Sequence, residues 1–159
     1  QVTSIGFLRL ITNMGMYDSL LPLIIPSIAS PAVFYFMYSY LESSLPLSLV
    51  EAARIDGSQE FRTFNQIVLP IMKPAMAVQA IFTFVGSWNN YFVPALVIQS
   101  KDKMTVPILI ALLRGADYMN RDMGKIYMMI LVAIVPIILI YLFLSKYIIA
   151  GVTLGGVKG

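Results

Sequence analysis

The sequence predicts an all-α membrane protein, a polytopic bundle of transmembrane helices, and three observations support this fold class. Of the 159 residues, 58% are hydrophobic and only 12% are charged, against about a quarter charged in soluble domains. The mean hydropathy is +0.81. Three long windows contain no charged residue: 19–41, 74–100 and 126–145. Because about 20 helical residues cross the hydrocarbon core, each window can span a membrane.

The residues before the first window are expected to form the end of a helix. Residues 1–12 are too few to cross a membrane alone, but their apolar side chains fit the tail of a preceding span. The first window then carries Pro22, Pro26 and Pro31. Because proline donates no backbone hydrogen bond, we expect an irregular entry, with the regular helix postponed to about 30–40 or kinked.

The connector after the first window, 42–73, is too polar to cross the bilayer and too regularly patterned for a loose loop. Apolar residues recur at helical spacing on both sides of Gly57, which predicts two short helices joined by a turn. Candidate caps are Ser43 or Ser44 for the first helix, with Pro46 in its first turn, and Asp56 or Ser58 for the second. We expect a short amphipathic elbow outside the membrane.

The second window is interrupted by a polar and aromatic run: Trp88, Asn89, Asn90 and Tyr91. Carboxamides inside a membrane face protein or water, so this run is a candidate lining for a solute pathway. The alternative is that the asparagines hydrogen-bond between helices while the Trp88 ring packs against a neighbour. The residue pattern leaves both roles open.

Prolines also lie late in the second window, at Pro94, and in the middle of the third, at Pro136. Each is expected to kink its helix, more often for packing than for gating. Between these windows lies a connector, 101–125, whose apolar segment 104–113 is too short to span a membrane. Basic residues are almost evenly divided between the two sides, so their distribution does not choose an orientation.

The composition excludes several chemistries. The chain has no Cys and no His, so it offers no thiolate nucleophile, disulfide, zinc–cysteine site or imidazole base. No GxxxxGKS or GxxxxGKT run is present to hold nucleotide phosphates. The net charge is +3, but the 11 basic residues are scattered, which does not favour nucleic-acid binding. We therefore expect no catalytic residue, metal site or cofactor in this chain.

The elbow carries a recognisable motif. Glu51-Ala52-Ala53 is followed after three residues by Gly57, and after nine more by Ile67, with Leu69-Pro70 directly behind. These seven residues resemble the EAA loop of permease subunits from binding-protein-dependent ABC importers, in which the same residue types stand at the same spacing. The stretch EAARIDG, the Trp88-Asn89-Asn90 run and the ending GVTLGGVKG are similar to the carbohydrate-uptake branch, particularly maltose-type permeases.

This resemblance implies the fold of a type I ABC importer permease, with six spans, of which the chain is similar to the C-terminal portion. Residues 1–12 would then end the third span, and the three windows would be the last three spans. The EAA loop 42–73 and the tail 146–159 would be cytoplasmic, and 101–125 would lie at the outer face. The implied location is the plasma (inner) membrane of a bacterium or archaeon.

The same resemblance implies the partners of such a permease. These are a dimeric ATPase that binds ATP, a second permease subunit, an extracytoplasmic solute-binding protein and membrane lipid. Within the elbow, Glu51 would meet a basic residue of the ATPase, and Gly57 would give the helix a sharp exit. The full implied coupling set is Leu47, Val50, Glu51, Ala52, Ala53, Asp56 and Gly57.

Two other function classes are less consistent with the sequence. A membrane enzyme could use Glu51, Asp56 and Glu60, but the first two lie on different helical faces and no second acidic cluster accompanies them. A secondary transporter driven by an ion gradient would need an ionisable residue inside a span, and the three windows contain none. A permease for another solute delivered by a binding protein remains the nearer alternative.

Overall fold

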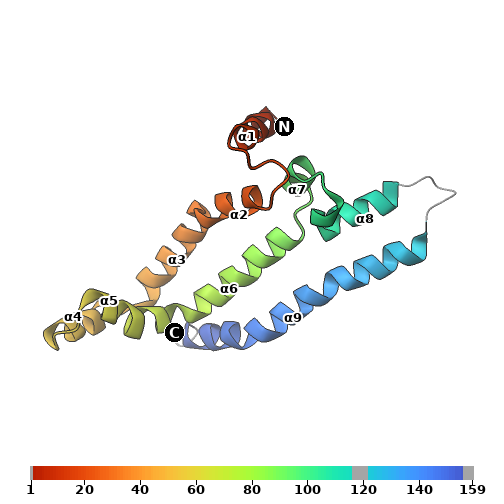
Figure 1. Cartoon of the computed structure of the whole chain (residues 1–159). Coiled ribbons are helices and arrows are strands. Elements are labelled where there is room, and N and C mark those ends of the chain that lie inside the picture. The colour runs from red at the N-terminus through yellow and green to blue at the C-terminus, as the bar shows by residue number, and fades with distance from the viewer. Residues whose placement is uncertain (1, 116–121, 156–159) are drawn as a thin grey trace. The chain divides into compact units, whose positions relative to one another are not determined.

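The computed structural model describes residues 2–115 and 122–155, and this part of the chain is helical with no strands. The predicted all-α class is confirmed. Parts of the expected outer connector, 116–121, and of the expected tail, 156–159, lie outside the described residues. The helices, drawn in Figure 1, are α1 Val2–Asn13, α2 Leu21–Ile28, α3 Pro31–Ser44, α4 Leu47–Ile55, α5 Glu60–Thr63, α6 Leu69–Trp88, α7 Phe92–Val97, α8 Val106–Gly115 and α9 Met123–Gly155.

Three helical runs in the described part are long and apolar enough to cross a membrane: Leu21–Ser44, Glu60–Trp88 and Met123–Ser145. The chain divides into two compact units. One unit comprises Gln1–Ser30 and Val85–Ile138, and the other comprises Pro31–Phe84 and Leu139–Gly159. Most large apolar side chains along these runs are exposed, as expected for helices that face lipid or other subunits rather than water.

In the first unit, α1 ends at a glycine in the left-handed conformation. Gly15 has φ +68°, and Met16 N–H donates to Ile11 O at 3.0 Å, which closes the helix end. Helix α2 contacts α7, and α8 lies beside the start of α9 (Figure 1). The buried side chains of this unit include Val97 and Ile108.

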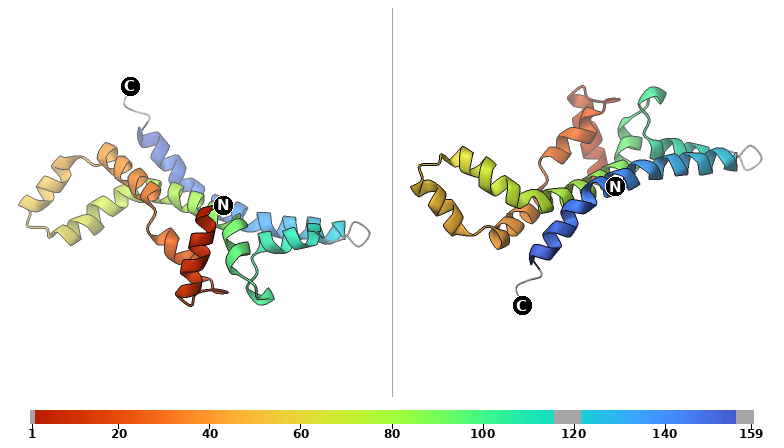
Figure 2. Two further views of the ribbon diagram at one scale, coloured as in Figure 1. Left: turned by 90° about the horizontal axis from the view of Figure 1, so that it is seen from above. Right: turned by 90° about the horizontal axis from the view of Figure 1, so that it is seen from below.

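The second unit contains α3, the elbow formed by α4 and α5, and most of α6. A π-helical turn, Phe64–Val68, joins α5 to α6, so the helix runs on from the elbow without a break. Figure 2 shows α4 and the helical run that begins with α5 as two arms that diverge from one turn. On α6, small or flexible buried residues such as Ala75, Ala77 and Met72 allow close packing.

The first predicted window differs from the structure in where its helix starts. Helix α2 begins at Leu21, earlier than expected, because Pro22 occupies the first helical turn, where its missing N–H removes no hydrogen bond. The break instead falls at Ala29–Ser30, directly before Pro31, where the proline ring disfavours helical geometry in the preceding residue. Pro26 stays inside α2.

The second window is also shifted. Helix α6 starts before Pro74 and ends at Trp88, so the expected span 74–100 is not one helix. A lysine such as Lys73 limits a charge-free window, but it does not end a helix, because its long side chain can reach polar surroundings. Pro94 lies within the separate short helix α7, whereas α9 continues as a helix through Pro136.

The predicted side-chain caps of the elbow are wrong. In the described part of the chain neither α4 nor α5 has a side-chain cap hydrogen bond. The Ser43 hydroxyl donates to Tyr40 O at 2.9 Å, and the Ser58 hydroxyl accepts from Thr63 Oγ1 at 2.9 Å, so both hydroxyls are used elsewhere. Pro46 is itself the cap residue of α4.

Candidate coupling elbow and solute hollow

The turn of the elbow is set by Gly57. Its φ is +76°, a left-handed conformation that costs other residues energy. Ser58 N–H donates to Ala53 O at 2.9 Å and Gly57 N–H donates to Arg54 O at 3.0 Å, the paired bonds of a Schellman helix end. The motif glycine therefore ends α4 and redirects the chain within two residues.

Two further contacts hold the arms of the elbow together. Thr63 Oγ1 donates to Ser58 Oγ, and the Arg54 guanidinium pairs with Glu60 Oε1 at 2.8 Å. Ala53 on α4 and Thr63 on α5 are both buried. The ion pair is exposed and adds little stability.

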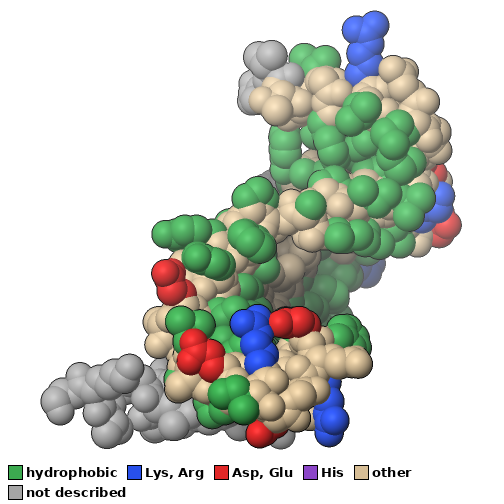
Figure 3. All heavy atoms as spheres, turned by 90° about the vertical axis from the view of Figure 1, so that its left-hand side faces the viewer, with side chains coloured by type: hydrophobic (Ala, Val, Ile, Leu, Met, Phe, Trp, Pro, Cys, Tyr) green, Lys and Arg blue, Asp and Glu red, His purple; other side chains and the backbone are tan. Residues whose placement is uncertain are grey.

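The elbow presents apolar side chains to its surroundings. Leu47, Ile55 and Phe61 are 73%, 87% and 78% exposed. Glu51 and Ala52, which precede Ile55 on α4, are exposed as well. Figure 3 views the chain from this side and shows acidic and basic side chains among hydrophobic ones. Exposed apolar side chains outside a membrane span, with charged residues among them, mark a candidate protein interaction surface.

The coupling set expected from the motif divides into two groups in the structure. Leu47, Glu51, Ala52, Asp56 and Gly57 are exposed and Val50 is half-buried. Ala53 is buried with 9% exposure, so its side chain packs mainly within the elbow. Ile55 and Phe61 are strongly exposed and lie outside the expected coupling set. For Ile55, an apolar residue two positions before a helix-ending glycine was a usable signal.

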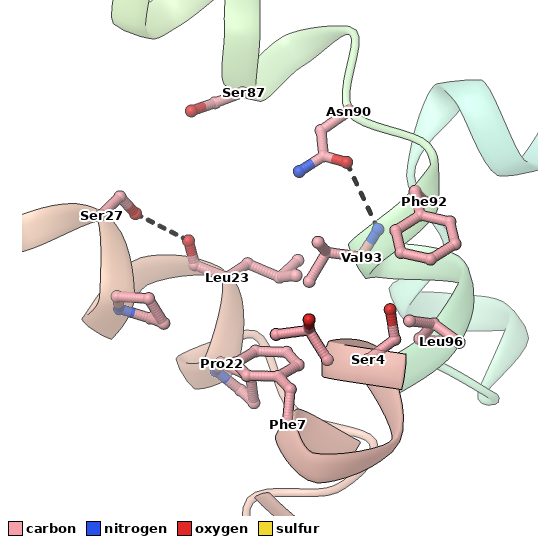
Figure 4. A pocket seen from close by; sticks show the side chains of 12 residues that line it. Ser4, Phe7, Pro22, Leu23, Ser27, Ser87, Asn90, Phe92, Val93 and Leu96 are labelled. Atoms are coloured by element: carbon pink, nitrogen blue, oxygen red, sulfur yellow. Dashed lines mark hydrogen bonds between the residues drawn. The ribbon is translucent and has the colours of Figure 1, made fainter. Parts of the chain in front are cut away.

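A hollow of about 480 Å³ lies in the first unit (Figure 4). That volume is within the usual range for small-molecule sites. Its walls come from α1, α2, the end of α6 and α7, and they combine hydroxyl and amide groups with two phenylalanine rings. The lining residues are Thr3, Ser4, Phe7, Pro22, Leu23, Pro26, Ser27, Ser87, Asn90, Phe92, Val93 and Leu96.

Asn90 is the amide of this hollow. Its Oδ1 accepts the backbone N–H of Val93 at 3.3 Å, which anchors the side chain at the start of α7. Figure 4 shows the Asn90 amide nitrogen turned toward the open space. The Ser27 hydroxyl donates to Leu23 O at 2.8 Å and keeps its oxygen as an acceptor. Charged side chains are absent among the described residues that line the hollow.

The other residues of the polar run take different positions. Trp88 Nε1–H donates to Ala133 O at 2.9 Å on α9. This bond joins the end of α6 to the middle of α9. Asn89 and Tyr91 are exposed and do not line the hollow. The structure thus separates a packing residue, Trp88, from a lining residue, Asn90.

Over the described residues, no group of three or more Asp and Glu side chains is arranged to hold a metal ion. The start of α9 has an acidic cap, because Asp122 Oδ1 accepts Lys125 N–H at 3.0 Å. This hydrogen bond, with the Lys125 side chain beside it, holds the pKa of the Asp122 carboxyl below its usual range. The cap is structural and lies apart from the residues that line the hollow.

Comparison with known proteins places this arrangement in a family. Residues 4–153 match the family model described as binding-protein-dependent transport system inner membrane component. The chain is 38% identical, over its full length, to the arabinooligosaccharides transport system permease protein AraQ of Bacillus subtilis, of which it covers 56%. It is 30% identical, again over its full length, to the trehalose/maltose transport system permease protein MalG of Thermococcus litoralis, of which it covers 58%.

A third relative is the diacetylchitobiose uptake system permease protein NgcG of Streptomyces coelicolor, 33% identical over 90% of this chain and 48% of that protein. The chain thus spans about half the length of these relatives. A crystal structure of a bacterial ABC transporter involved in the import of the acidic polysaccharide alginate has a similar fold. Its TM-score is 0.76 at 22% identity, over 90% of this chain and 55% of that one.

Proposed function

Because this chain belongs to the family of binding-protein-dependent transport system inner membrane components, we propose that it forms part of an ABC importer permease for neutral oligosaccharides. The predicted resemblance to sugar permeases is confirmed by the relatives, and the multi-pass membrane character agrees with three apolar helical runs. Members of this family are transport components rather than enzymes. The carbohydrate cargo of this chain is inferred from the arabinooligosaccharide, chitobiose and trehalose/maltose systems to which it is similar.

The observation that carries the mechanism is the exposed apolar elbow. A separate ATPase dimer that binds ATP can move membrane helices only through a contact that differs between its states. Leu47 and Ile55 offer apolar anchors, and Glu51 offers a charge for a basic partner residue. The unbroken helical run from α5 into α6 would carry movement of the elbow into a candidate span. The complete importer includes a second permease and an extracytoplasmic solute-binding protein.

Charge reversal in the elbow tests this coupling. In the purified full complex, Glu51→Lys should leave membrane insertion intact but separate ATP hydrolysis from saccharide uptake. Glu42→Lys is the matched control, because Glu42 is also exposed but lies on α3 outside the elbow. If Glu51→Lys complexes keep normal substrate-stimulated ATPase activity and uptake, the elbow is not the coupling surface.

The hollow is the proposed place where this chain meets the solute. Hydroxyl and amide groups beside aromatic faces suit an uncharged sugar ring, and the uncharged lining disfavours an anionic one. Asn90→Ala should raise the apparent KM for saccharide uptake several-fold. Asn89→Ala is its matched control, because the neighbouring amide does not line the hollow. Equal uptake kinetics for both variants would remove the hollow from the pathway.

A further inference from the structure

A single carboxylate joins two connections that are far apart in the sequence. Asp18, between α1 and α2, accepts the backbone N–H groups of Gln99 and Ser100 on Oδ1 at 2.8 and 2.9 Å. Its Oδ2 accepts the Ser100 hydroxyl. Lys103 Nζ donates to the Asp18 carbonyl at 2.7 Å and lies 3.3 Å from Oδ2. In return, Asp18 N–H donates to Val97 O at 3.0 Å.

The backbone conformation of Asp18 is unusual as well. Asp18 has φ +53°, in the left-handed region that few residues other than glycine, asparagine and aspartate adopt. The Ser100 hydroxyl, followed by the backbone N–H groups of Ser100 and Gln99, holds the pKa of the Asp18 carboxyl well below its usual range. The charge is therefore retained in mildly acidic surroundings, and charge-assisted bonds are the stronger kind.

The contact lies where the walls of the hollow are joined. Asp18 precedes α2, and the backbone it binds follows directly from α7. Phe7 on α1, Leu23 on α2 and Val93 on α7 all line the hollow, and α2 also contacts α7. All of these segments belong to the same compact unit. Asp18, through its carboxylate and its backbone, thus ties the connection between α1 and α2 to the segment that follows α7.

We propose that Asp18 is a positioning residue whose bonds to Gln99, Ser100 and Lys103 stay closed through the transport cycle, so that α1, α2 and α7 move as one body. The proposal rests on the proposed function, since it assigns these helices to the solute pathway. The aspartate clamp, meaning Asp18 with these three partners, would keep the hollow in a fixed shape for its solute. A binding site loses affinity when the residues that hold its lining groups in position are removed.

Two substitution pairs test the clamp in the full importer complex. Asp18→Asn tolerates the left-handed backbone but loses the charge and one strong acceptor, and Lys103→Met removes the ammonium. We expect about a tenfold rise in the apparent KM for saccharide uptake in Asp18→Asn, with basal ATPase activity unchanged. Asp102→Asn and Lys101→Met are the controls, since both lie on the same exposed turn and should leave the KM unchanged.

A disulfide in place of the bonds between positions 18 and 100 tests whether this contact stays closed or must open during transport. The chain contains no Cys, so Asp18→Cys combined with Ser100→Cys introduces one candidate disulfide in these 159 residues. Oxidation should restore much of the uptake that the reduced double variant loses. Loss of uptake on oxidation, reversed by dithiothreitol, would mean that the clamp must open, and would overturn the proposal.

The single variants decide the matter even if the disulfide does not form. An Asp18→Asn complex with wild-type KM overturns the positioning role. This outcome differs from failure of the proposed function, in which the wild-type complex itself would import no saccharide. A fall in maximal uptake with unchanged KM would indicate loss of folded complex rather than loss of positioning, and would also count against the clamp.

Discussion

Gly57 offers the sharpest test of the elbow, because the effect of its backbone conformation can be distinguished from the effect of crowding around an added side chain. At φ +76°, an L-residue with a Cβ loses about 1–2 kcal/mol, with asparagine at the low end and β-branched valine at the high end. Apart from Gly57 and its two chain neighbours, no described heavy atom lies within 4 Å of the Cβ that a substitution would add, so the added Cβ is not crowded by other parts of the described chain. The cost is therefore a property of the backbone alone.

A penalty of about 1–2 kcal/mol lowers the ratio of elbows with this turn formed to elbows without it by about 5- to 30-fold. We expect coupling to fall in the order Gly57→Asn, Gly57→Ala and Gly57→Val, with membrane insertion nearly constant. The assay is the ratio of saccharide uptake to ATP hydrolysis in reconstituted full complexes. If coupling instead falls with side-chain volume, so that Gly57→Asn couples less well than Gly57→Ala, a partner surface must lie directly against the glycine.

Gly15 provides a matched control in the other compact unit. It has φ +68° and the same pattern of helix-ending bonds, and apart from its chain neighbours no described heavy atom lies within 4 Å of an added Cβ. Gly15→Val should therefore carry a similar backbone cost, and it should lower the yield or thermal stability of the complex while leaving the uptake-to-ATPase ratio unchanged. If Gly15→Val and Gly57→Val change that ratio equally, the elbow has no special part in coupling.

Three further outcomes are expected. Trp88→Phe removes the indole hydrogen bond to Ala133 O on α9, and should cost about 0.5–2 kcal/mol of stability in thermal unfolding of detergent-solubilised complex. Arg54→Ala should change stability by less than about 1 kcal/mol, because its pair with Glu60 is exposed; a larger loss in the same assay would show that the pair is not solvent-screened. The pKa of Asp122 is lowered on folding, so its stabilisation is present above the ordinary value of 3.8 and is lost as the pH falls through the lower folded pKa. In Asp122→Asn, stability should therefore fall less steeply as the pH is lowered around and below 3.8. An unchanged pH dependence would show that this cap does not contribute to the loss of stability in acid.

Sequence reasoning reached the parts of the fold that depend on local pattern. Apolar windows predict membrane helices because the bilayer requires their length and composition, whatever their neighbours. Gly57 was assigned correctly to the end of α4, because a left-handed helix end leaves a local signature. The family could be identified as well, because the seven motif positions of the elbow lie close together in the chain.

What sequence reasoning missed depends on distant contacts. Asp18 and Ser100 are 82 positions apart, and nothing near either residue indicates the other. The Trp88 bond to Ala133 is likewise set by how two helices meet. The bounds of α6 were misplaced because charge-free windows measure membrane compatibility, whereas a helix ends where its backbone bonds end. The burial of Ala53 was not predictable either, because a motif position does not tell which face of the helix it occupies.

The central claim, that the elbow is held by a separate ATPase, is tested most directly by cross-linking in the assembled complex. A single Ile55→Cys, at a side chain that is 87% exposed, would be treated with a short thiol-to-amine cross-linker. Gln99→Cys, exposed in the other unit, is the control. We expect Ile55→Cys to join the ATPase and Gln99→Cys not to do so. An intact, transporting complex in which Ile55→Cys reacts freely with water-soluble reagents from the outer face, and never joins the ATPase, would contradict the account.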